Sequence, residues 1–261
     1  MKIPKISVVM AVYNEEKFLE ESVDSILNQT FKDWELVIVN DCSTDNSLNI
    51  IKSYMKKDKR IRLVNNKKNG GCPDSRNDGL KISKGEYIAI LDGDDVSHPK
   101  RLEKEVNYLE KNPHIFLVGS SAVYINEEGK EIRRFRKYND HEMLAWRLPQ
   151  SCGIVHSSIM FRNEGLIYNN YFKGASDYKF YLDLLSKGKN LTNLPEFLVR
   201  YRLHGGSMSI SGKEMQEGFS NEAKEQIDFK SKFRIRFLPK LFIHYIKTIN
   251  EKREKNLPIT S

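Results

Sequence analysis

Short apolar runs alternate with amphipathic stretches along the first half of the chain. The runs are nearly continuous and rich in β-branched residues, as is typical of strands buried on both faces of a parallel sheet. They predict strands over residues 6–12, 34–39, 61–64 and 86–91. Helical spacing of apolar residues predicts helices over about 18–27, from a cap at Ser43 or Thr44 to Met55, and over about 73–83. This βαβαβαβ order predicts an α/β fold with a mostly parallel, Rossmann-like sheet flanked by helices.

The second half of the chain has a more mixed pattern, without regular βα alternation. Strands are predicted over residues 115–118, 121–125, 158–162 and 197–203, and helices over about 99–109, 140–147 and 177–186. The basic segment 133–138 is predicted to be a loop. We therefore expect a mixed half to extend the parallel one.

Residues 213–261 form a predicted basic, amphipathic, helical tail. From residue 225 onward the chain has nine Lys or Arg against four Asp or Glu, so much of the net charge of +8 lies here. The aromatic and basic residues of 225–250 fit contact with an anionic membrane surface, but packing against the domain or a dimer contact fits equally. No RNA-binding signature accompanies them, so nucleic acid is not an expected partner.

The composition, 39% hydrophobic and 30% charged over 261 residues, is that of a soluble globular protein. No apolar run approaches the roughly 18 residues of a membrane span, and the first residues lack the core of a signal peptide. The three cysteines form no pattern typical of a disulfide framework or a zinc site. We therefore expect a cytoplasmic protein with reduced thiols.

Acidic residues follow the fourth predicted strand, in the sequence Leu91-Asp92-Gly93-Asp94-Asp95. Carboxylates gathered at a strand end repel one another, and a hard divalent cation that also binds substrate phosphates relieves this repulsion. An acidic turn without a metal is the alternative. Asn14 and Asp41 also follow predicted strands, and the carboxyl ends of parallel strands meet at one crevice. Their convergence favours a metal and diphosphate site.

Four segments together resemble the family 2 inverting glycosyltransferases of the GT-A fold. They are residues 7–15 (SVVMAVYNE), 39–45 (VNDCSTD), 75–77 (SRN) and 91–95 (LDGDD). The resemblance covers about residues 5–210, with 176–178 (SDY) and 201–207 (YRLHGGS) at the places of later family motifs. The chain departs from the usual pattern at Asn40, Cys42 and Ser176, where an acid, a Gly or Asn, and an acid are common.

The resemblance implies a nucleotide-diphosphate sugar donor. Tyr13 is expected to stack on the nucleobase, and the backbone of Ala11 and Val12 to bind the edge of the base. Asp41 is expected to accept the N3–H of uracil, which favours a UDP-sugar. Arg76 supplies a planar cation for the base or the diphosphate.

The same resemblance implies a bound Mn²⁺ or Mg²⁺. Asp94 is expected to coordinate the ion directly, while Asp92 faces both the ribose and the metal, with Gly93 in the donor site. Asp95 is expected to support the loop or the bound sugar. His204 matches a histidine that in part of the family helps to hold the metal or diphosphate, before a mobile glycine loop.

Asp177 matches the general base of the family, which takes the proton of the acceptor hydroxyl. From position alone, an N-cap of the following helix is the alternative role for Asp177. Trp146 is a candidate stacking platform for the acceptor sugar, with a place in the partly buried core as the alternative.

The resemblance therefore predicts a metal-dependent hexosyl- or N-acetylhexosaminyltransferase that forms a β-glycosidic bond on a saccharide or lipid-linked saccharide, in cell-surface polysaccharide synthesis. It divides the chain into a nucleotide-sugar half (1–95), an acceptor and catalytic half (96–212), and the tail (213–261). The enzyme is expected in the cytoplasm or at the inner face of the membrane, and it can be oligomeric. A catalytically silent nucleotide-sugar or glycan-binding module and, less favoured, a nucleotidyltransferase are the alternatives.

Overall fold

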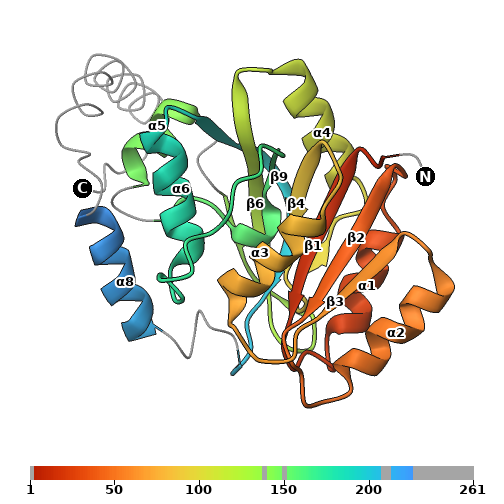
Figure 1. The fold of residues 1–261 in the computed structure, drawn as a ribbon. Coiled ribbons are helices and arrows are strands. Elements are labelled where there is room, and N and C mark those ends of the chain that lie inside the picture. The colour runs from red at the N-terminus through yellow and green to blue at the C-terminus, as the bar shows by residue number, and fades with distance from the viewer. Residues whose placement is uncertain (1–2, 137–139, 149–151, 207–212, 226–261) are drawn as a thin grey trace.

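The computed structural model describes residues 3–136, 140–148, 152–206 and 213–225 (Figure 1). One sheet of nine strands runs through the molecule, in the order β3-β2-β1-β4-β8-β6-β9-β5, with β7 paired to β6. Helices cover both faces of this sheet, as the alternating pattern predicts. The α/β prediction is confirmed.

The first half of the chain forms a parallel βα unit. Its strands are β1 (Ile6–Val12), β2 (Trp34–Asn40), β3 (Ile61–Asn65) and β4 (Tyr87–Ile90), and its helices are α1 (Leu19–Leu27), α2 (Ser47–Lys57) and α3 (Cys72–Ile82). Strand β1 lies between β2 and β4, and all three strands run in the same direction. Because the strands are parallel, their carboxyl ends open on one edge of the sheet.

The second half extends the sheet with strands of both directions. Its strands are β5 (Val96–Ser97), β6 (Ile115–Ile125), β7 (Glu131–Phe135), β8 (Met160–Arg162) and β9 (Asn190–Arg202). Its helices are α4 (Arg101–Lys111), α5 (His141–Arg147), α6 (Ser176–Ser186) and α8 (Lys213–Glu225), with a 3₁₀ turn at His156–Ser158. Strand β8 is antiparallel to β4 and to β6, whereas β9 is parallel to β6. The expectation of a mixed second half is confirmed.

Two apolar cores lie on opposite faces of the sheet. Ile6, Val8 and Met10 of β1 pack in one core with residues of α1, α2 and α4. Val9, which points to the other face, packs in the second core with residues of α5 and α6. Successive side chains of a strand alternate between faces, so a strand buried on both sides must be apolar at nearly every position. This burial explains the continuous apolar runs.

Several strands differ from the prediction: β5 was not expected, and β9 begins at Asn190 instead of residue 197. Segment 133–138 was expected to be a loop, but Glu131–Phe135 form β7, antiparallel to β6. All five residues of β7 are exposed, so the segment has no apolar pattern that marks it as a strand. Strand β6 is also continuous where two short strands were predicted.

Helix α2 begins later than predicted. Its first residue is Ser47, and neither Ser43 nor Thr44 caps it. The Ser43 hydroxyl instead accepts a hydrogen bond from the Asn14 amide, 3.1 Å away. The side chain expected to cap the helix therefore joins the loops after β1 and β2.

Helix α8 begins the segment predicted to be a helical tail, and it packs against the domain. The ring of Phe219 lies 6.0 Å from that of Phe172, and Ala223 is fully buried. The apolar stripe predicted farther along the tail lies outside the described residues, so membrane contact through 225–250 stays a prediction. Among the described residues no helix has the length and apolar character of a membrane span.

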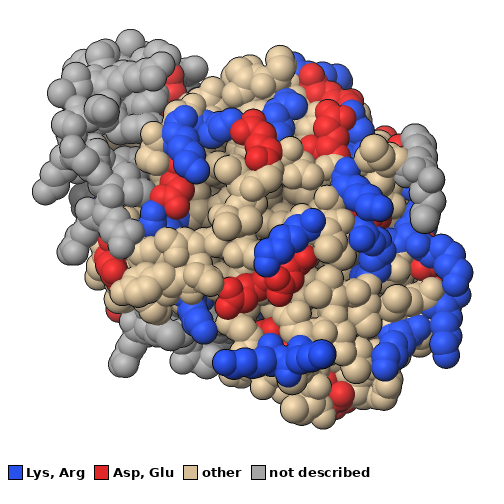
Figure 2. All heavy atoms as spheres, in the orientation of Figure 1, with Lys and Arg blue, Asp and Glu red and all other residues tan. Residues whose placement is uncertain are grey.

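Positive charge also gathers on the body of the protein. The sequence did not indicate this, because much of its net charge lies in the tail. Figure 2 shows Lys and Arg side chains over α2, at the right of the view. Lys52, Lys56 and Lys57 of this helix are exposed. The basic character is thus not confined to the tail.

Candidate active site

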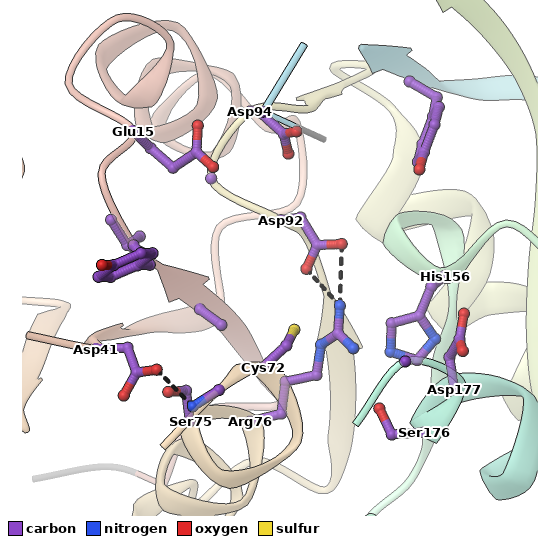
Figure 3. Close-up of a pocket in the computed structure, with 18 of the residues that line it drawn as sticks. Glu15, Asp41, Cys72, Ser75, Arg76, Asp92, Asp94, His156, Ser176 and Asp177 are labelled. Atoms are coloured by element: carbon purple, nitrogen blue, oxygen red, sulfur yellow. Dashed lines mark hydrogen bonds and ion pairs between the residues drawn. The ribbon is translucent and has the colours of Figure 1, made fainter. Parts of the chain in front are cut away.

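The largest group of predicted site residues surrounds one cavity of about 820 Å³, at the carboxyl ends of β1, β2 and β4 (Figure 3). The predicted residues that line it are Ala11, Val12, Tyr13, Asp41, Arg76, Asp92, Gly93, Asp94 and Asp177. His204 reaches the cavity wall through a contact between its Nε2 atom and Asp94, 2.9 Å away. Trp146 is not among the lining residues.

The loops after β1 and β2 are fixed to each other. Asn14 and Cys42 have φ angles of 56° and 63°, in the left-handed region. The Asn14 side-chain oxygen accepts from the Thr44 amide at 2.8 Å, and the Glu15 amide donates to the Ser47 hydroxyl at 2.9 Å. Gly or Asn is usual in the left-handed region, which explains why the family prefers them at the place of Cys42. These bonds present Tyr13 and Glu15 to the cavity.

Asp41 holds the loop that leads into α3. Its carboxylate accepts hydrogen bonds from the Asn66 side chain at 3.2 Å and from the amides of Gly70 and Gly71 at 3.1 and 2.9 Å. A carboxylate has about four acceptor positions, so these three donors leave one for a ligand. Asp41 can therefore shape the loop and still bind a donor group in the cavity.

The acidic turn after β4 approaches β1 closely. A Cβ atom on Gly93 would lie 3.2 Å from Cγ2 of Val12, a tight contact that a side chain there could keep only if Val12 or the turn shifted slightly. Asp95 points into the protein, where its Oδ1 accepts from the Arg202 amide at 2.7 Å. Burial, reinforced by the charges of Asp94 and Asp92, raises the pKa of Asp95 well above its ordinary value. Asp95 thus supports the turn, in agreement with the expectation from sequence.

Asp92 forms an ion pair with Arg76. Both of its oxygens accept from Nη2 of Arg76, at 2.8 and 3.0 Å, and the Ser157 hydroxyl lies 3.2 Å from Oδ2 (Figure 3). Burial is the largest influence and disfavours the charge of Arg76, but Asp92, Cys72 and Tyr168 together outweigh it and hold the pKa of the guanidinium well above its usual value. The metal and ribose roles expected for Asp92 therefore have to compete with this pair.

Glu15, Asp94 and His204 form a potential metal site. One ligand atom of each lies within 4.8 Å of those of the other two. Burial, followed by the charges of Asp94 and Asp92, raises the pKa of Glu15 to about 8. Two carboxylate oxygens and one imidazole nitrogen suit Mn²⁺, whereas Mg²⁺ prefers oxygen ligands alone. The residues present thus fit a divalent ion.

Asp177 lies on the far side of the cavity from that cluster (Figure 3). It is in the first turn of α6, whose N-cap is Ala175, so the alternative role of Asp177 as N-cap is wrong. Its Oδ1 accepts from the Tyr178 amide at 2.7 Å. Burial raises the pKa of Asp177 more than Arg76 lowers it, so its carboxylate is a stronger base than an exposed one.

A buried histidine, His156, lines the cavity near Asp177 (Figure 3). Its Nδ1 lies 2.6 Å from the Tyr181 hydroxyl, and its Nε2 lies 3.1 Å from the Tyr168 hydroxyl. Burial lowers the pKa of His156 well below its ordinary value, with Arg76 acting in the same direction. A neutral imidazole between two hydroxyls is a rigid part of the wall.

Glu15 and His156 had no role in the sequence interpretation. Glu15 follows a predicted strand, as Asn14 does. Residues in this position lie at the carboxyl edge of a parallel sheet, so the sequence could have indicated Glu15 as a site residue. His156 lies in an irregular segment and reaches the site only through packing, so no pattern marked it. Trp146 is half-buried on α5, with the Arg147 guanidinium 4.8 Å from its ring centroid, and the structure does not bring it to the cavity.

Comparison with known proteins identifies the family. The family model "Glycosyl transferase family 2" matches residues 7–167. A putative glycosyltransferase of Bacillus subtilis, EpsE, is 46% identical over 207 residues, which are 76% of this chain and 73% of the relative. The O-antigen biosynthesis glycosyltransferase WbnJ of Escherichia coli is 32% identical over 252 residues, which are 94% of this chain and 96% of the relative.

The fold has a counterpart of known structure. The S. aureus protein TarS, solved as residues 1–349 in complex with UDP-GlcNAc, superposes with a TM-score of 0.67 at 22% identity. The match covers 78% of this chain and 60% of that structure. The sheet, the strand-end motifs and these matches agree, and the chain belongs to the family 2 glycosyltransferases of the GT-A fold.

Proposed function

We propose that the protein is a metal-dependent, inverting glycosyltransferase that moves a sugar from a UDP-sugar to a hydroxyl of a saccharide or lipid-linked saccharide during cell-surface polysaccharide synthesis. The observation that carries the proposal is the arrangement of two groups around one cavity. Glu15 and Asp94, with His204, lie on one side, and Asp177 lies on the other (Figure 3). The first group suits a diphosphate with its cation, and the second suits a reacting hydroxyl.

The donor end of the cavity fits a nucleobase. Tyr13 is 48% exposed at the end of β1, which leaves its ring available for stacking. The acceptor position left on Asp41 suits the N3–H of uracil, which cytosine lacks. The complex of TarS with UDP-GlcNAc supports the same donor class, and the O-antigen biosynthesis named for WbnJ supports the same process.

Asp177 is the residue that activates the acceptor. Its carboxylate takes the proton of the acceptor hydroxyl while that oxygen bonds to the anomeric carbon and the bond from this carbon to the diphosphate breaks. Attack from the face opposite the diphosphate inverts the configuration, so an α-linked donor gives a β-linked product. Glu15, Asp94 and His204 would hold a divalent ion, which when bound would neutralise the charge that grows on the leaving diphosphate.

A donor panel tests the proposal. The protein is incubated with Mn²⁺ and UDP-, GDP- or dTDP-sugars, with and without saccharide acceptors, and released nucleoside diphosphate is measured. We expect turnover of a UDP-sugar that is abolished by chelation and by Asp94→Asn. Failure to bind or turn over any donor contradicts the proposal. If the unchanged protein binds UDP with Mn²⁺ but is as inactive as Asp177→Asn, the protein is a silent binding module instead.

A further inference from the structure

Three side chains from neighbouring strands form a continuous row on one wall of the cavity. Tyr124 of β6 is the register partner of Arg133 on β7 and of Tyr201 on β9. Register partners on adjacent strands project from the same face of a sheet, and all three residues line the cavity. We call this row, together with Phe135, the β7 shelf.

The β7 shelf is aromatic and carries one cation. The ring of Tyr124 lies 5.2 Å from that of Tyr201 and 5.9 Å from that of Phe135. The guanidinium of Arg133 lies over the Tyr124 ring, 4.6 Å from its centroid, and 5.8 Å from that of Phe135. Aromatic rings can stack on the apolar faces of sugar rings. A guanidinium that lies flat over an aromatic ring still has N–H groups at its edge that can donate hydrogen bonds.

Arg133 has no acidic partner among the residues that the structure describes. The next residue, Arg134, projects from the other face of β7, and its guanidinium pairs with Glu131 at 2.8 Å. Arg134 does not line the cavity, whereas Arg133 is exposed and does. An exposed guanidinium at the edge of a binding cavity forms its strongest hydrogen bonds with a carboxylate or a phosphate.

The β7 shelf lies in the half of the protein that does not hold the donor. The residues suited to the nucleotide and the metal come mainly from the ends of β1, β2 and β4, whereas the shelf belongs to β6, β7 and β9. We propose that the shelf binds the acceptor and that this acceptor is anionic, with a carboxylate or phosphate group that pairs with Arg133. This inference rests on the proposed function, and it narrows the acceptor to a class of charged glycans.

Direct binding to the whole protein tests this inference without turnover. The probes are methyl glucoside, galactoside and mannoside, each as the neutral sugar, the 6-carboxylate and the 6-phosphate, in the presence of UDP and Mn²⁺. Dissociation constants come from ligand-observed NMR. For at least one sugar we expect the dissociation constant of an anionic form to be about tenfold lower than that of the neutral form. A tenfold ratio corresponds to the free energy of about one charge-assisted hydrogen bond. The 6-carboxylate and 6-phosphate arms show which anion is preferred.

Variants of the two neighbouring arginines identify the group responsible. Arg133→Ala should remove the preference for the anionic form and leave binding of the neutral form within about twofold, while Arg133→Lys keeps part of it. Arg134→Ala, the matched control on the same strand, should keep the preference in full. Equal binding of neutral and anionic probes for all three sugars overturns the inference, as does an unchanged preference in Arg133→Ala.

The same samples separate this inference from the proposed function. UDP binding with Mn²⁺ is measured in parallel, and it should be the same in Arg133→Ala as in the unchanged protein. A loss of UDP affinity in this variant assigns Arg133 to the donor and overturns the inference. Absence of UDP binding in the unchanged protein contradicts the proposed donor, and the acceptor probes still report on the shelf.

Discussion

Among the individual residues of the site and its loops, two have features that lower the stability of the folded protein. Asp177 is a carboxyl group whose pKa is raised because burial penalises its charge. Cys42 occupies a left-handed backbone conformation, at φ 63°, that suits Gly or Asn better. Each feature is tolerated because neighbouring structure fixes the residue, and each gives a measurable consequence.

Replacing Asp177 with Asn should separate activity from stability. We expect activity to fall by about 10²–10⁴-fold, because no base remains for the acceptor proton, while UDP and Mn²⁺ still bind. Because the pKa of Asp177 is raised by folding, the folded state binds more protons than the unfolded state. The free energy of unfolding therefore decreases as the pH rises above about 3.9, the pKa of an unfolded Asp, since the charged carboxylate is disfavoured in the folded protein. The variant should therefore be more stable than the unchanged protein at pH 7 and equally stable in acid. Urea unfolding at neutral and at acidic pH measures this difference.

The activity of the unchanged protein should fall in acid, because the protonated Asp177 cannot accept the acceptor proton. The pH profile of activity should have its midpoint above about 3.9.

Cys42 allows a test of the backbone conformation alone. Cys42→Gly and Cys42→Ala both remove the thiol, but only Gly relieves the left-handed strain. We expect the Gly variant to be more stable than the Ala variant by about 1 kcal/mol, although Gly also gains entropy in the unfolded chain. Chemical denaturation of the two variants gives the difference. A more stable Ala variant contradicts the assigned strain.

At the scale of elements, helix α3 carries Arg76 to the cavity because it packs directly on the sheet. The contact is made at Gly79, where a Cβ atom would lie 2.6 Å from Cγ1 of Val9 on β1 and 3.1 Å from Cγ2 of Val39 on β2. The helix therefore sits at the closest distance that the backbone permits. Arg76 precedes Gly79 by less than one turn, so the position of the Arg76–Asp92 pair depends on this contact.

The same substitution on two helices isolates that packing contact. Gly79→Ala should destabilise the protein by about 1–3 kcal/mol, because α3 has to move away from β1. Gly218→Ala, in α8, meets nothing within 4 Å and should stabilise the protein by about 0.5–1 kcal/mol through helix propensity. Thermal unfolding of the two variants and of the unchanged protein measures both changes in stability. Equal effects of the two substitutions contradict the packing role of Gly79.

At the scale of the whole molecule, the metal cluster joins three separate parts of the chain. Glu15 follows β1, Asp94 follows β4, and His204 follows β9. A cation bound to all three stabilises only the folded state, because the unfolded chain does not hold these residues together. Binding of a cation at this potential site would therefore be coupled to the global stability of the fold.

We expect Mn²⁺ to raise the melting temperature of the protein and EDTA to reverse the change. At a free concentration of 100 times the dissociation constant, the stabilisation is about 2.7 kcal/mol. Glu15→Gln should reduce the shift, whereas Glu20→Gln, at an exposed position on α1 outside the cluster, is the control for the same Glu-to-Gln change without a ligand position. An equal shift in both variants contradicts the assignment of Glu15 as a ligand.

The order of elements in the first half of the chain, and the edge of the sheet where the site lies, follow from the sequence alone. Apolar runs mark strands buried on both faces, and residues that follow them, such as Asp41 and Asp94, must gather at the carboxyl edge. Both properties depend on residues close in sequence and on a general rule of parallel sheets, so the folded structure is not required to infer them.

Only the tertiary structure decided which side chains meet. It placed Glu15 beside His204, paired Asp92 with Arg76, left Trp146 outside the cavity and turned a predicted loop into β7. These outcomes depend on strand register and on how helices pack, which are set by contacts between distant parts of the chain. Local spacing carries no information on such contacts, and for this reason the β7 shelf, with Arg133, is recognisable only in the folded protein.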